Sequence, residues 1–190
     1  MPYPERVETE RLLLRRWTAG DLGAMRAIWS DPAVLQSLHP SDSGDPDEIA
    51  RNALKRHVGA WERDGFGLWA AVDPAEDEVI GWIGAWRQDV GPELGGEVEV
   101  GWTLRSPWWG RGLALEGARA AAATAFAEFD VERLISLIGA DNQRSIAVAT
   151  RLGSRPDGTT PHGRIPGLEL SVYSLSRSTF GASPQSRSSL

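Results

Sequence analysis

The order of the predicted elements indicates a mixed α/β fold, with a mostly antiparallel central sheet and helices on both faces. Three predicted strands, at residues 66–72, 79–87 and 96–104, follow one another through connections too short for a crossover helix. Helical patterns precede and follow this group, and a strand, a glycine turn and a long helix fill residues 96–129. We therefore expect a mixed α/β sheet rather than a doubly wound parallel one.

The N-terminal part predicts one strand and one helix. Residues 8–17, with a leucine-rich centre, have the apolar content of a first strand. Thr18 is a suitable cap for a helix that runs through Ile28 or Trp29. Asp31-Pro32 then breaks that helix.

A second helix is predicted after a polar loop at residues 40–47. Residues 45–48 (DPDE) provide an acceptor at the cap, proline in the first turn and glutamate three residues after the cap. The helix should run to about Arg63, with Gly65 as its C-terminal stop. The two strands that follow are joined by the acidic turn 73–78.

The C-terminal half alternates strands and helices and ends in a serine-rich tail. The predicted elements are a loop at 89–95, a strand at 96–104, a helix within 106–129, a strand at 133–139, a helix at 142–152 stopped by Gly153, a turn-rich loop at 157–167 and a strand at 168–175. We expect a single domain at residues 1–176 and a disordered tail at 177–190.

Composition excludes several classes of function. The chain has 190 residues, 41% hydrophobic, and no apolar run near the roughly 20 residues that span a bilayer. Its N-terminus lacks the regions of a signal peptide, so a cytoplasmic location and no membrane partner are expected. With no cysteine, disulfides, thiolate metal sites and a thioester intermediate are excluded, and three scattered histidines do not predict a metal site.

The charge balance argues against nucleic acid as a partner. The net charge is −6, and Lys55 is the single lysine beside nineteen arginines. A weakly acidic protein suits a cationic substrate such as an amine, although solubility alone also explains the charge.

The glycine turn at residues 110–114 predicts an anion site. A strand, a glycine turn and a helix leave backbone N–H groups and a positive helix end free for an anion. A P-loop would need Lys-Ser/Thr where Leu113-Ala114 stand, and a dinucleotide fingerprint would need glycine in place of Leu115. The alternative is a tight turn with no ligand.

Several motifs resemble those of the GNAT N-acetyltransferases, particularly the RimJ/RimL-like branch. The strand end Glu-Val-Gly-Trp at 99–102 and the turn Trp-Trp-Gly-Arg-Gly at 108–112 are similar to that branch's acyl-CoA-binding segment. The pair Asn142 and Ser145, with Leu-Gly at 152–153, is similar to its Asn-x-x-Ser motif, and residues 10–15 (ERLLLR) look like its first strand. The resemblance implies the GNAT-like acyl-CoA N-acyltransferase fold and acetyl-CoA as co-substrate, without a metal.

The resemblance also implies which residues bind acetyl-CoA. The pyrophosphate would lie on the turn at the helix N-terminus, and the pantetheine arm would pair with the strand like an extra strand. Asn142 would cap its helix, bind the pantetheine, or do both. The implied cofactor-binding residues are Trp102, Thr103, Leu104, Trp109, Gly110, Arg111, Gly112, Leu113, Ala114, Asn142 and Ser145.

Catalysis requires a base for the amine proton and a hydrogen bond for the leaving thiolate. Glu99 is the leading candidate base, and Glu97 shares its face of the strand. Both glutamates could instead be solvent-facing partners of arginines. Many superfamily members have a tyrosine at the position of Ala149, so Ser145 is the candidate for contacting the sulfur, unless it bonds only backbone.

The sequence as a whole predicts an enzyme that transfers acetyl from acetyl-CoA to an amine in a ternary complex. By resemblance the acceptor is a protein or peptide N-terminal α-amine. A small-molecule amine and a non-catalytic acyl-CoA-binding domain are the alternatives, and a homodimer is a family-level expectation. Acceptor choice is expected in the loops 38–46, 88–95 and 159–167, and most of the nine tryptophans are expected in the core or in an acceptor wall. We expect His57 on the surface.

Overall fold

The computed structural model describes residues 3–38, 45–88, 94–163 and 165–182. Its elements in chain order are β1 (Arg6–Glu8), β2 (Leu13–Arg15), η1 (Ala19–Asp21), α1 (Leu22–Trp29), α2 (Pro32–Leu38), α3 (Pro46–Asp64), β3 (Leu68–Asp73), β4 (Glu78–Arg87), β5 (Val98–Leu104), η2 (Ser106–Trp108), α5 (Leu113–Glu128), β6 (Arg133–Gly139), α6 (Gln143–Leu152), β7 (Arg155–Pro161), β8 (Glu169–Ser176) and α7 (Arg177–Ala182).

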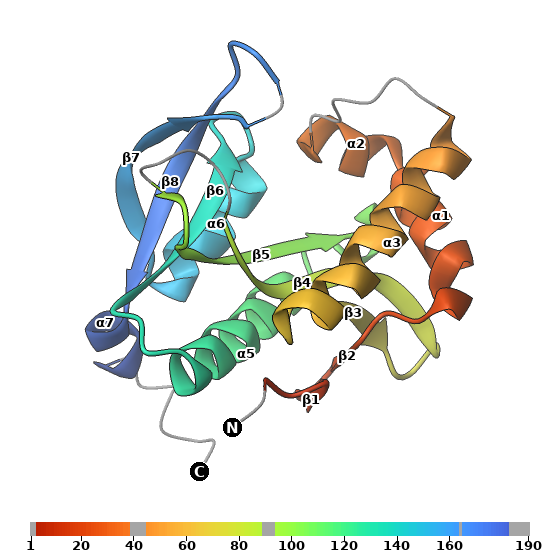
Figure 1. Cartoon of the computed structure of the whole chain (residues 1–190), viewed down its shortest axis with the longest axis horizontal. Coiled ribbons are helices and arrows are strands. Elements are labelled where there is room, and N and C mark those ends of the chain that lie inside the picture. The colour runs from red at the N-terminus through yellow and green to blue at the C-terminus, as the bar shows by residue number, and fades with distance from the viewer. Residues whose placement is uncertain (1–2, 39–44, 89–93, 164, 183–190) are drawn as a thin grey trace.

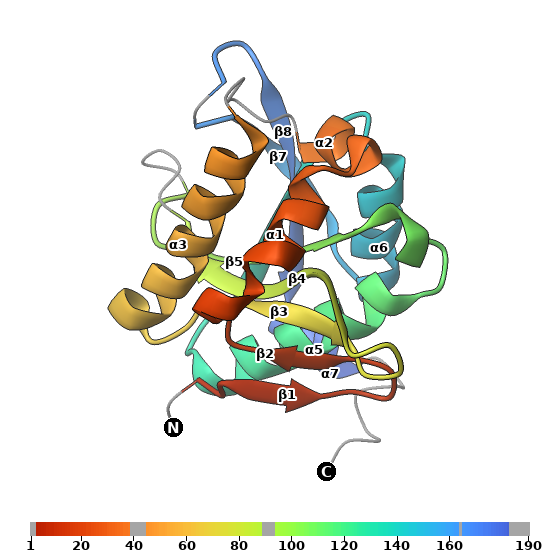
Figure 2. The same ribbon diagram turned by 90° about the vertical axis from the view of Figure 1, so that its right-hand side faces the viewer.

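The described strands form one mixed sheet, which confirms the predicted fold class. The sheet has eight strands in the order β1-β2-β3-β4-β5-β6-β8-β7, and only the β5–β6 pair is parallel. The strands β3, β4 and β5 follow one another as antiparallel neighbours, as predicted. Helix α5 covers one face of this part of the sheet, and α1 and α3 cover the other (Figures 1 and 2).

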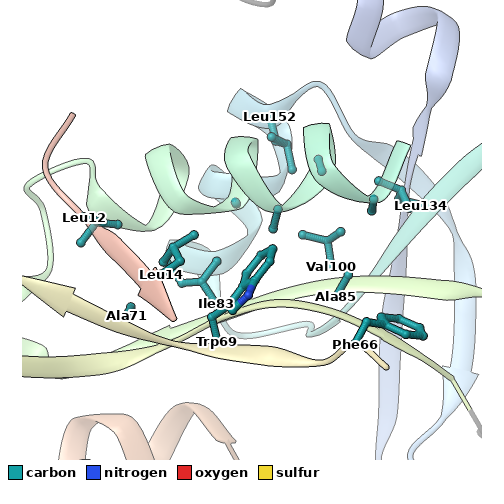
Figure 3. Close-up of a cluster of buried hydrophobic side chains, with 14 of the residues drawn as sticks. Leu12, Leu14, Phe66, Trp69, Ala71, Ile83, Ala85, Val100, Leu134 and Leu152 are labelled. Carbon is teal, nitrogen blue, oxygen red and sulfur yellow. The ribbon is translucent and has the colours of Figure 1, made fainter. Parts of the chain in front are cut away.

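Helix α5 packs closely on the sheet because its buried face is made of small residues. Ala118, Ala121, Ala122 and Ala125 are fully buried. At Gly117 even a Cβ atom would lie 2.3 Å from the tip of Ile83. Figure 3 shows the buried side chains in the layer below this helix, among them Leu12, Leu14, Trp69, Ile83 and Val100. This layer fixes the N-terminus of α5 relative to β5.

The N-terminal strand prediction is wrong in one respect. Residues 8–17 do not form one strand; β1 and β2 pair as a short hairpin, with Arg6 opposite Arg15. The Thr9 N–H donates to the Leu12 carbonyl, 2.9 Å away, and closes the turn between them. Because this turn reverses the chain, β2 pairs with β3 while β1 lies at the edge of the sheet.

The helix ends follow their capping residues. Asp45 accepts a hydrogen bond from the N–H of Asp47, and Gly65 ends α3 with φ of 73°, as predicted. Asp31 does more than end α1, because its Oδ1 accepts the Ala33 N–H and begins α2, which the sequence did not predict. The predicted loops at 40–47 and 89–95 lie largely outside the described residues.

Two C-terminal predictions are also wrong. Residues 157–161, predicted as the start of the loop 157–167, belong to β7, because this strand pairs with β8 and absorbs the turn residues Asp157-Gly158 as a bulge. Residues 177–182 form α7 instead of a disordered tail. Arg177 donates to the carbonyls of Phe126, Phe129 and Val131, which attaches this helix to the end of α5.

Candidate functional site

The site begins where β5 and β6 separate. These parallel strands share a single registered pair, Glu99 with Ile135, and then diverge (Figure 1). A cleft of about 1270 Å³ opens there and extends from α1, α2 and α3 on one side to the starts of α5 and α6 on the other. Such a volume exceeds that of most small-ligand pockets and can hold two substrates at once.

The backbone of Trp102 faces this opening. Along β5 and at its two ends, the backbone groups of odd-numbered residues form hydrogen bonds with β4. The Gln88 N–H donates to the Glu97 carbonyl at 2.8 Å, and the Arg105 N–H donates to the Ile80 carbonyl at 2.8 Å. Backbone direction alternates along a strand, so even-numbered residues face β6. The neighbouring even-numbered carbonyls, of Val100 and Leu104, accept from Ser136 Oγ and Trp109 Nε1. Trp102 therefore presents backbone groups to the cleft, whereas the Thr103 backbone faces β4.

Glu99 is a buried carboxyl group at the point of separation. Its side chain is 4% exposed and accepts the Leu137 N–H of β6 at 3.2 Å and a hydrogen bond from Gln88 Nε2. Burial raises the pKa of Glu99 to about 8, although both hydrogen bonds favour the charged form. A carboxyl group with this pKa can accept and release a proton near neutral pH.

Glu97 has a different environment from Glu99. Its carboxylate pairs with Arg133 at 2.8 Å, and it does not line the cleft. The alternative, in which both glutamates are solvent-facing partners of arginines, agrees with the ion pair of Glu97 and is wrong for the buried Glu99.

The glycine turn leaves its backbone available at the other side of the opening. Trp109 Nε1 donates to the Leu104 carbonyl at 2.6 Å and fixes the start of the turn against β5. Gly110 and Gly112 have φ of 74° and 80°, a left-handed conformation that other residues adopt only with strain. No side chain caps α5, so the N–H groups of its first turn can receive an anion.

Residues far away in the sequence hold this turn from outside. Arg11 donates to the Arg111 carbonyl at 2.8 Å, and both its side chain and its N–H bond Glu116. Thr9 donates to the same carboxylate at 2.6 Å. Partial burial alone would raise the pKa of Glu116, but the hydrogen bonds from Thr9 and Arg11 hold this pKa below its ordinary value. No local sequence pattern indicates this support, because the partners are about a hundred residues apart.

The start of α6 faces the turn across the cleft. Asn142 caps the helix, and its Oδ1 accepts the Ser145 N–H at 3.1 Å. Within the described part of the chain, no partner is recorded for the Ser145 hydroxyl, which lines the cleft. The alternative in which this hydroxyl bonds the helix backbone is thus not observed.

The side of the cleft formed by α1, α3 and β4 has aromatic walls. Trp29 and Trp82 lie with ring centroids 6.0 Å apart, and His57 stacks on Trp17 and packs at a tilt against Trp82. Trp86 lies so close over Gly101 that a Cβ there would be 2.6 Å from its ring. Burial, with the charge of Arg56 as a second cause, lowers the pKa of His57 to about 4, so this ring is neutral. The expected surface histidine is a half-buried ring in the wall of the cleft, packed against two tryptophans.

Most of the predicted site residues lie along this one cleft. Those that line it are Glu99, Trp102, Thr103, Leu104, Trp109, Gly110, Gly112, Leu113, Ala114, Asn142 and Ser145. Arg111 does not line the cleft; its guanidinium carbon lies 6.0 Å from the centroid of the Trp108 ring. Gln88 and Ser136 are further lining residues that sequence reasoning missed. The β4–β5 register, which puts Trp86 opposite Glu99, is the signal that would have placed Gln88 on the same face.

The residues present fit an acyl-CoA. Exposed first-turn N–H groups suit a pyrophosphate, and the free backbone of Trp102 suits an amide-containing arm. Among the described residues, no three histidine, cysteine, aspartate or glutamate side chains gather where they could hold a metal ion. No helix in this part of the chain is long and apolar enough to cross a bilayer.

Comparisons with known proteins agree with this geometry. Residues 11–155 match the family described as acetyltransferase (GNAT) domain. An uncharacterized N-acetyltransferase p20 of Bacillus licheniformis is 25% identical over 173 residues, covering 90% of this chain and 95% of the relative.

Solved structures share the fold. An acetyltransferase from Agrobacterium tumefaciens superposes with a TM-score of 0.74 at 28% identity, covering 90% of this chain and 93% of the other. RimL, a ribosomal L7/L12 α-N-protein acetyltransferase, superposes with a TM-score of 0.70 at 18% identity, covering 90% and 94%. At that identity the likeness to RimL concerns the fold alone.

Proposed function

Because this chain belongs to the GNAT acetyltransferase family and is an acetyl-CoA-dependent acyltransferase, we propose that it acetylates a primary α-amine of a protein or peptide. Transfer is direct, within a ternary complex that fills the cleft. The observation that carries this proposal is the buried carboxyl group of Glu99, at the junction of the donor and acceptor sides.

Each side of the cleft has a separate task in this proposal. The turn from Trp109 to Ala114 binds the pyrophosphate, and Trp102 pairs with the pantetheine arm. The amine approaches along Trp82 and Trp86 and gives its proton to Glu99, directly or through a water. As the amine nitrogen bonds the acyl carbon, the carbon–sulfur bond breaks, and the Ser145 hydroxyl donates a hydrogen bond to the leaving thiolate.

The pKa of Glu99 supports an α-amine as acceptor. A protein α-amine has an ordinary pKa of roughly 8 and a lysine side chain of roughly 10. A base with a pKa of about 8 is matched to the first group, whereas a lysine or polyamine would need a stronger base. The RimJ/RimL-like branch is proposed on the motifs at 99–102, 108–112 and 142–145, and the name of the structural neighbour RimL agrees with it.

Two alternatives differ in measurable ways. A small-molecule amine acetyltransferase would use the same donor side with another acceptor. A non-catalytic acyl-CoA-binding domain would bind the donor and release no thiol. A cytoplasmic location and a homodimer also stay predictions.

The decisive experiment measures thiol release from acetyl-CoA with a panel of peptides, amino acids, amino sugars and polyamines. Peptide α-amines should be the best acceptors at pH 7.5. Glu99→Gln should lower kcat by about 10² to 10⁴-fold, the range expected for loss of a general base, with unchanged CoA affinity.

Glu97→Gln is the matched control, because it removes a carboxylate that directly precedes β5 and lies outside the cleft. Its kcat should stay within about twofold of the wild type. If the two substitutions have equal effects, Glu99 is not the base. If CoA binds and no amine releases thiol, the binding-domain alternative is correct.

A further inference from the structure

Helix α6 directs two arginines toward the donor side of the cleft. Arg144 and Arg151 both line the cleft and are seven residues apart. Seven residues are two helical turns, so both lie on one face, about 10 Å apart along the axis.

Arg144 is held directly beside the glycine turn. Its guanidinium carbon lies 4.0 Å from the centroid of the Trp109 ring, a short cation–π distance. Trp109 is itself fixed by its bond to the Leu104 carbonyl. Among the described residues no carboxylate pairs with Arg144, so its N–H donors are available next to the first turn of α5.

Arg151 lies farther along the groove between α5 and α6. Its carbonyl accepts from Arg119 of α5 at 3.2 Å, which places this end of α6 against the middle of α5. Leu115, Ala147 and Val148 also line the cleft, and the last two lie between the arginines along α6. No carboxylate in the described part of the chain pairs with the Arg151 side chain, which is exposed. The groove thus has an apolar floor with one guanidinium at each end.

We propose that Arg151 binds the 3′-phosphate of coenzyme A while Arg144 binds its pyrophosphate, so that the enzyme selects 3′-phosphorylated donors. This inference rests on the donor half of the proposed function. The 3′-phosphate and the pyrophosphate are attached to the same ribose, whose adenine lies on the apolar floor. Guanidinium groups suit both anions, because their paired N–H donors match phosphate oxygens.

The test is isothermal titration of the full chain with CoA and with 3′-dephospho-CoA, in the absence of acceptor. The wild type should bind CoA about tenfold more tightly than dephospho-CoA, and 0.5 M salt should reduce this ratio. Arg151→Gln should abolish the ratio by weakening CoA alone. Arg144→Gln should weaken both ligands about equally. Arg155→Gln, an exposed arginine outside the cleft, is the control and should change neither.

The possible results separate this inference from its premise. Equal binding of both ligands by the wild type, or a ratio that survives in Arg151→Gln, overturns the 3′-phosphate site. Arg151 near the end of a helix can also stabilise α6 through the helix dipole. If that is its whole role, the substitution lowers the melting temperature and leaves the ratio intact. Failure of CoA itself to bind overturns the donor site of the proposed function, whereas selective binding without acetyl transfer leaves this inference standing.

Discussion

The donor and acceptor sides of the cleft are built in different ways. The donor side depends on backbone groups, and its central part comes from one short stretch, β5, the glycine turn and α5. The acceptor side depends on side chains from α1, α3 and β4, which are separated by up to about sixty residues. Backbone geometry is fixed by local sequence, so a donor site can remain constant while the acceptor wall changes. This difference predicts that substitutions on one side should leave the other side intact.

The largest effect should come from a negative charge in the turn. Gly112→Glu places a side chain at φ of 80° and a carboxylate where a pyrophosphate would lie. CoA affinity should fall at least about 100-fold by calorimetry.

The control for this substitution is Gly158→Glu. Gly158 has φ of 96° with open space around it, and it lies outside the cleft. This variant carries the same charge and backbone strain but should bind CoA normally. Normal binding by Gly112→Glu would disprove the turn as the phosphate site.

The next effect is the dependence of kcat on pH, which involves Glu99 at the junction of the two sides. A carboxyl group with a pKa of about 8 acts as a base only when it is deprotonated, so kcat at saturating substrates should fall about tenfold per unit below pH 8. In Glu99→Gln, kcat should no longer fall in this way below pH 8. His57, with a pKa of about 4, does not change its protonation in this range and should not contribute to the fall.

The raised pKa of Glu99 also has a consequence for stability. Protonated Glu99 favours the folded state, so its contribution is present below pH 4.5 and is lost as pH rises toward 8. The melting temperature of the wild type relative to Glu99→Gln should fall across that interval. A constant difference would mean that Glu99 is not buried with a raised pKa.

A smaller effect should come from the hydroxyl group at the start of α6. Ser145→Ala removes a donor to the leaving thiolate and should lower kcat about tenfold, the value of a hydrogen bond to a charged group. Ser145→Thr keeps the hydroxyl and should restore most of the rate. If alanine matches the wild type, the thiolate receives its hydrogen bond elsewhere.

The smallest effect should be confined to the acceptor side. Trp86→Leu removes part of the aromatic wall over Gly101 and should raise the acceptor KM about fivefold, from lost apolar contact. CoA affinity, measured without acceptor, should not change. A parallel loss of CoA affinity would contradict the separation of the two sides.

The elements that could be predicted from the sequence are those set by capping residues and glycines close to them in the chain. The strand-to-turn-to-helix unit followed from its glycines, the start of α3 from Asp45-Pro46, and the start of α6 from Asn142. These features depend on backbone conformation and on hydrogen bonds within a few residues. The predicted donor residues therefore lie along one cleft, with Arg111 as the exception.

The environment of each chemical group depends on tertiary contacts that the sequence did not reveal. Glu97 directly precedes β5 and Glu99 lies within it, yet one pairs with Arg133 and the other is buried beside Gln88. The raised pKa of Glu99 depends on its burial against β6 and on the β4–β5 register, which no local pattern encodes. The support of the turn by Arg11 and the stacking of His57 have the same origin. Burial and pairing across long sequence separations set the strength of a base, so the sequence could name Glu99 but could not assign its pKa.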